Sequence, residues 1–163
     1  DNTIFNFRVF PDETGPVTVD VPAGTTADLA GNLNVAAPQF SINADVTNPT
    51  ILSVLRGFNG ASRIPETTSL DVVSWFVKFS EDIIRPVASD FSVTGTTSPI
   101  TISEVNADEY EISLAGGDIA TVNGTVTLSI SRDNEIKDVA GNGVGSLFPS
   151  GAYENSFIMD NDA

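Results

Sequence analysis

The chain has 163 residues, with 22 acidic and 7 basic side chains, and therefore a net charge of −15. It contains no cysteine and no histidine, which excludes disulfide scaffolds, zinc fingers and Ser-His-Asp triads. So negative a chain repels phosphates, so we expect neither nucleic acid nor an anionic membrane surface as a partner. No apolar run reaches the roughly 18 residues of a membrane span, so no membrane insertion is expected. The expected ligands are cations.

Apolar and polar residues alternate with period two along much of the chain, which predicts short β-strands. In chain order, these strands are expected at residues 5–9, 17–21, 73–79, 110–114 and 126–130. Helix-period patterns are scarce. Short one-sided strands separated by turn residues favour an all-β fold, an antiparallel β-sandwich. Trp75 falls within the third strand, where a core position is favoured over a sugar-stacking surface.

An internal repeat organises these elements. The three segments of the first copy recur in the same order in the second: Gly15–Val21, Asp28–Asn32 and Phe40–Asp45, then Gly124–Ile130, Asp138–Asn142 and Phe157–Asp162. Nothing in the first copy matches residues 50–108. We therefore expect residues 1–48 to be the C-terminal part of one unit and residues 49–163 to be a complete unit. The boundary is a polar linker that Pro49 stiffens.

Asp-x-Ala-Gly-Asn late in a unit, followed by a linker such as Asp45–Thr50, resembles the bacterial Ig-like repeats of giant surface adhesins. The segments Gly15–Gly24 and Val77–Asp82 are also similar to parts of these repeats, and Asp160–Ala163 resembles the linkers of cadherins. The resemblance implies immunoglobulin-like sandwiches in tandem, with calcium at the junctions and neighbouring Ig-like domains as partners. It further implies an extracellular or cell-surface location in a bacterium. The chain departs from the pattern in lacking the early strands of the first unit.

The two Asp-x-Ala-Gly-Asn segments allow two interpretations. Calcium takes six to eight oxygen ligands, and a tight loop with Asp and Asn oxygens supplies several of them. The alternative is a β-turn in which Gly takes a positive φ and Asp accepts backbone amides. Acidic residues in the linkers favour the metal. The candidate calcium ligands are Asp28, Asn32, Asp45, Glu81, Asp138, Asn142, Asp160 and Asp162. Glu81 is included in case its strand ends at the same pole as Asp138.

Within this set, we expect Asp28 and Asn32 to face Asp45 at one junction. Asp138 and Asn142 are expected to face Asp162 at the next. Carboxylates crowded without a cation repel one another, so calcium is expected to raise the melting temperature.

The preferred function is therefore a non-catalytic Ig-like repeat, a calcium-stiffened spacer or adhesion element. One alternative is a carbohydrate-binding accessory module with a glycan or protein receptor. Another is a self-assembling surface, filament or phage decoration subunit, because residues 1–48 expose strand edges and invite a homo-oligomer. Asn123-Gly-Thr125 matches a glycosylation sequon, although a turn before the strand at 126–130 is the favoured role.

Overall fold

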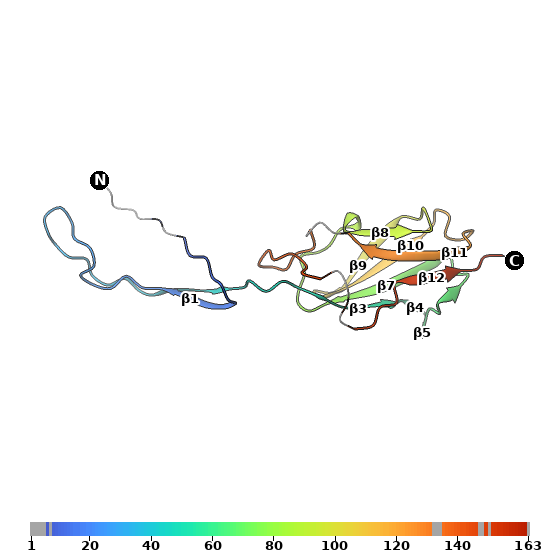
Figure 1. Cartoon of the computed structure of the whole chain (residues 1–163), viewed down its shortest axis with the longest axis horizontal. Coiled ribbons are helices and arrows are strands. Elements are labelled where there is room, and N and C mark those ends of the chain that lie inside the picture. Colours follow the sequence, from blue (N-terminus) through green and yellow to red (C-terminus); the bar gives the residue numbers. More distant parts are fainter. Residues whose placement is uncertain (1–5, 7, 132–134, 147–148, 150, 163) are drawn as a thin grey trace. The chain divides into compact units, whose positions relative to one another are not determined.

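The computed structural model describes residues 6, 8–131, 135–146, 149 and 151–162. The chain forms two compact units, Asp1–Thr47 (unit 1) and Asn48–Ala163 (unit 2). The division falls inside the linker Asp45–Thr50. In Figure 1 the colours follow the sequence, from blue at the N-terminus to red at the C-terminus. In the described part of the chain, no helix is long and apolar enough to cross a bilayer.

In its described residues, unit 1 contains one two-stranded antiparallel sheet. Strand β1, Gly15–Val19, pairs with β2, Phe40–Ala44, so that Gly15 lies opposite Ala44 and Val19 opposite Phe40. The predicted strand at residues 5–9 lies partly outside the described residues, and its described positions 6, 8 and 9 are not in a strand.

Unit 2 contains ten strands and one short 3-10 helix in its described residues. The strands are β3 Ile51–Arg56, β4 Phe58–Asn59, β5 Ser62–Arg63, β6 Thr67–Thr68, β7 Val72–Phe79, β8 Phe91–Thr94, β9 Ile100–Asn106, β10 Glu109–Ala115, β11 Gly124–Ile130 and β12 Ser156–Met159. The helix η1, Ala88–Asp90, precedes β8.

Eight of these strands form two four-stranded sheets, with orders β3-β7-β10-β9 and β6-β12-β11-β8. All pairs are antiparallel except β12 with β6, which is parallel. The seven strands of unit 2 other than β4, β5 and β6 can be lettered A to G in chain order. The first sheet is then A-B-E-D, and β8-β11-β12 is C-F-G. This is the strand order of an immunoglobulin constant-type sandwich. The predicted all-β antiparallel sandwich is therefore confirmed.

The core lies between the two sheets. Along β7, Val73, Trp75, Val77 and Phe79 are buried, and alternate residues of β10 and β11 are buried in the same way. Trp75 contacts Phe157 of the opposite sheet, with ring centroids 4.9 Å apart. The alternation therefore identified the inward side chains of these strands. Trp75 is 0% exposed, so it offers no surface for stacking a sugar.

Candidate metal centre

The segment that follows β7 carries Glu81 and is held against the start of β3. The Thr50 amide donates to Ser80 Oγ, and the Ser80 amide donates to the Thr50 carbonyl, both at 2.9 Å. Nearby, the Gly145 amide donates to the carbonyl of Pro49 at 2.9 Å. The entry of the chain into unit 2 is therefore fixed at the same end as Glu81.

Tyr110 of β10 and Ile83 join this segment to the loop that carries Asp138. The Ile83 carbonyl accepts a hydrogen bond from the Tyr110 hydroxyl at 3.1 Å. Ile83 also forms an isolated β-bridge with Asp138, and the Ile84 amide donates to Lys137 at 2.7 Å. Burial raises the pKa of Tyr110, which keeps its hydroxyl proton available for donation.

Asp138 and Asn142 close a tight turn. The Asp138 amide donates to the Asn142 carbonyl at 3.0 Å, and Gly141 adopts a φ of 95°, which glycine tolerates without strain. The Asn142 backbone amide and side-chain amide donate to Asp138 Oδ1 and Oδ2, both at 2.8 Å. Asp138 is 1% exposed. Burial acts to raise its pKa, but the bonds from Asn142, Gly141 and Ala140 outweigh it and hold the pKa below 3.8.

Carboxylate oxygens of Glu81 and Asp138 lie within 4.8 Å of each other. Two negative charges at this distance repel, more strongly where water is partly excluded, and a bridging cation would remove the repulsion. Carboxylate oxygens are ligands that hard divalent cations such as calcium prefer, so the donor set fits such an ion. Within the described residues of unit 2, Glu81 and Asp138 therefore form the carboxylate pair of a candidate metal site. Asp45, the candidate ligand of the linker, belongs to unit 1.

The first copy of the turn does not approach Asp45, contrary to expectation. Asp28 and Asn32 lie in the loop between β1 and β2, beyond the Val19–Phe40 end of the sheet. Asp45 follows the other end, where Thr14 Oγ1 and the Thr47 amide donate to its Oδ1 at 3.1 and 2.9 Å. A five-residue strand separates the two ends by about 17 Å. The bond from the Asn32 side chain is the main cause of a lowered pKa of Asp28.

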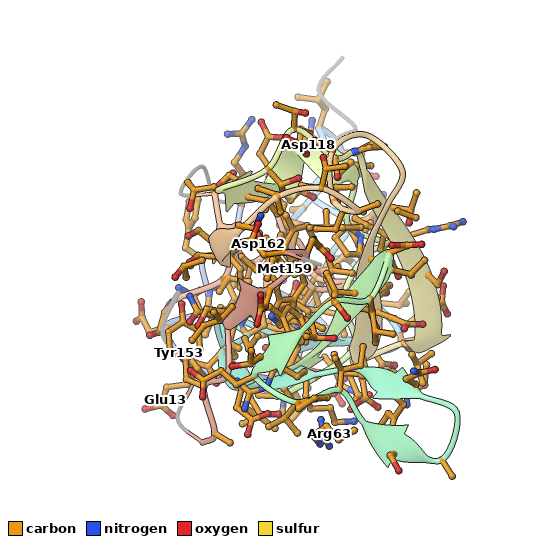
Figure 2. The ribbon with its side chains drawn as sticks, turned by 90° about the vertical axis from the view of Figure 1, so that its right-hand side faces the viewer. Glu13, Arg63, Asp118, Tyr153, Met159 and Asp162 are labelled. Atoms are coloured by element: carbon orange, nitrogen blue, oxygen red, sulfur yellow. The ribbon has the colours of Figure 1, made fainter. Side chains whose placement is uncertain are left out.

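The expected meeting of Asp138 and Asn142 with Asp162 is also wrong. Asp162 lies beyond β12, beside the start of β11, whereas Asp138 follows the end of β11. Asp160 lies at the same end as Asp162, where its amide donates to the carbonyl of Thr68 at 3.0 Å. Figure 2 looks onto this end of unit 2, where Asp118, Met159 and Asp162 are labelled. Strand β12 lies between Asp138 and Asp162 in the chain and runs antiparallel to β11, so the two aspartates lie at opposite ends of the sandwich.

Asn123 holds the exit segment of unit 2, a role that sequence reasoning missed. Its Nδ2 donates to Asp162 Oδ1 at 2.9 Å, and its Oδ1 accepts the Asn161 amide at 2.7 Å. Both polar atoms of the sequon side chain are therefore used inside the fold. Unit 1 has a similar arrangement, because Thr14, also placed just before a strand-opening glycine, holds Asp45. The sequence signal for this role was the polar residue, Thr14 or Asn123, that precedes the first glycine of the repeated strand.

Comparisons of this chain with protein-family models, with curated proteins and with solved structures found no match.

Proposed function

We propose that this chain is a non-catalytic Ig-like repeat module of a bacterial surface or secreted protein. It acts as a spacer or adhesion element, and calcium stiffens the joint at which the linker enters unit 2. The observation that carries this proposal is the Glu81–Asp138 carboxylate pair, which lies at the end of unit 2 where Pro49 and Thr50 enter.

We propose Asp45 as the third carboxylate of the site, because the covalent chain keeps it near the residues at which the linker enters unit 2. Asp45 precedes Asn48 by three peptide units, which span at most about 11 Å. Asn48 lies close to Gly145, next to the loop that carries Asp138 and Asn142. One ion bound by Asp45, Glu81 and Asp138, with Asn142 as a further oxygen donor, would restrict rotation about the linker.

Differential scanning calorimetry with and without EDTA tests this proposal. At a calcium concentration about 100 times the Kd, binding stabilises the folded state by about 2.7 kcal/mol, which raises the Tm by about 8 °C. Glu81→Gln keeps the size of the side chain and removes one charge. We expect this variant to lose most of the calcium-dependent shift.

Asp162→Asn is the matched control, because it removes an acidic charge at the opposite end of unit 2. It should keep the full shift. An equal response to calcium in the wild type and in Glu81→Gln would rule out this site. Asp45→Asn tests the linker ligand separately: if its shift equals that of the wild type, the ion binds unit 2 without bridging the joint.

A further inference from the structure

The two strands of unit 1 form a ribbon with one apolar and one polar face. In the register of β1 and β2, Val17 lies opposite Ile42 and Val19 opposite Phe40. Residues opposite each other in an antiparallel pair project to the same side, so these four side chains share a face. The other face carries Pro16, Thr18, Ser41 and Asn43. Strand β1 is drawn in blue in Figure 1.

The apolar face is open to solvent in the structure. Phe40 is 58% exposed and Ile42 is 50% exposed. An isolated two-stranded sheet is marginally stable in water, because it buries too little apolar surface. Burial of this face against another sheet would therefore stabilise the ribbon.

The repeat shows what kind of surface covers such a ribbon. Strands β11 and β12 are the second copy of β1 and β2, and their inward residues are at most 1% exposed: Val126, Leu128, Phe157 and Met159. In unit 2 these side chains belong to the core that also contains the inward residues of β3, β7 and β10. The pairing differs by two residues, with Gly15 opposite Ala44 but Gly124 opposite Met159. An even shift keeps the same residues on the same face.

The residues at the edges of the ribbon also favour burial in a larger assembly of strands. Natural edge strands commonly carry charged side chains or proline that prevent further pairing, but Phe40–Ala44 contains neither and Gly15–Val19 contains only Pro16. Strands β11 and β12 also lack charged residues, and each is flanked by a further strand, β8 and β6 respectively. In a chain with a net charge of −15, two uncharged edges beside an apolar face are suited to the interior of a larger sheet.

We propose that the apolar face of β1 and β2 docks onto the inner face of a second sheet of the β3-β7-β10-β9 kind. The occupant is the corresponding sheet of another immunoglobulin-type unit. The inner face of that sheet is lined by branched aliphatic and aromatic side chains. In a second copy of this chain, β11 and β12 already cover that sheet, so a second copy is not the occupant. The proposal concerns unit 1 and does not depend on calcium.

The test supplies such a sheet covalently and follows hydrogen exchange. In an extended chain, a second copy of residues 48–122 takes the place of residues 1–13. It is followed by residues 14–163 of the protein. We expect the paired amides of β1 and β2 to exchange at least tenfold more slowly than in the original chain. In the original chain, they are expected to exchange much faster than those of β11 and β12.

Phe40→Ser with Ile42→Ser in the extended chain should abolish the added protection. Ser41→Thr, on the polar face of the same strand, should retain it. Unchanged exchange in the extended chain, or equal protection in both variants, overturns the proposal. Sedimentation of the original chain supplies the last criterion: a monomer with slow β1–β2 exchange needs no partner, and a dimer with slow exchange makes a second copy the occupant. Either result overturns the proposal.

Discussion

At the scale of single residues, the same five-residue turn occurs in two surroundings. Asp28 and Asp138 both accept the backbone and side-chain amides of an Asn four positions later, and both turns contain a glycine with positive φ. The motif therefore builds its own turn, as the turn interpretation predicted. What distinguishes Asp138 is burial and the nearby carboxylate of Glu81. The metal-binding potential of this motif comes from its neighbours.

Asp118 provides a pH prediction that does not involve the metal centre. Its Oδ1 accepts bonds from the Thr96 hydroxyl and, at 2.9 Å, from the Thr97 amide. The bond from Thr96 is the main cause that holds the pKa of Asp118 below 3.8. A lowered carboxyl pKa stabilises the fold above the unfolded value, and this contribution is lost as the pH falls from 3.8 through the folded value.

Asp118→Asn should therefore reduce stability at pH 7 and flatten its pH dependence below about pH 4. Urea unfolding of both proteins between pH 7 and pH 3 measures the difference. Thr96→Val removes the principal donor and should reproduce part of the flattening. Parallel curves for the wild type and Asp118→Asn would show that this carboxylate contributes nothing to acid stability.

At the scale of elements, β7, β10 and β11 were predicted from alternation, whereas β3, β8, β9 and the two-residue strands were not. Period-two alternation in β7, β10 and β11 follows directly from burying one face of each strand. The pairs β4–β5 and β6–β12 rest on two residues each, too few for any periodic signal. Alternation predicted a strand at residues 17–21, which the structure places at Gly15–Val19, and the repeat matched Phe40–Asp45 with Phe157–Asp162 without identifying them as the strands β2 and β12.

The candidate site was predictable only in part. Glu81 was predicted to join Asp138 on the condition that its strand ends at the same pole, and the two do lie together. The placements of Asp28 and Asp162 were wrong, because a motif does not reveal which end of a strand faces which loop. Pairing between strands that are distant in sequence decides which loops meet at one end of the sandwich, and the sequence pattern does not show that pairing.

Tyr110 gives a prediction at this scale, because it ties β10 to the segment that carries Glu81. Tyr110→Phe keeps the ring, which packs edge-on against Phe79, and removes the bond to Ile83. We expect a loss of about 1 kcal/mol in unfolding free energy. Calcium affinity, measured by isothermal titration calorimetry, should also fall, since Glu81 is less firmly positioned. Destabilisation with unchanged affinity would limit Tyr110 to a structural role.

At the scale of the whole molecule, the net charge of −15 has two separable effects. Repulsion among all acidic groups is screened by any salt, whereas a specific site responds to one ion. We therefore expect NaCl to raise the Tm modestly and CaCl2 at matched ionic strength to raise it further. In Glu81→Gln, the gap between the two salts should close while the NaCl effect remains. A persistent gap would indicate calcium binding elsewhere.

The parallel bridges between β3 and the segment that leads into β12 have a mechanical consequence. The chain enters unit 2 at Asn48, just before β3, and Asp162 follows β12, where Asn123 holds it. Tension applied through these two points pulls β3 toward its N-terminal end and the segment that continues into β12 toward its C-terminal end. Because Val54 and Tyr153 are joined by a parallel bridge, this force slides one segment along the other and loads their hydrogen bonds together. An antiparallel hairpin pulled from its open end would release them one at a time. Unit 2 is thus arranged to resist stretching by shear.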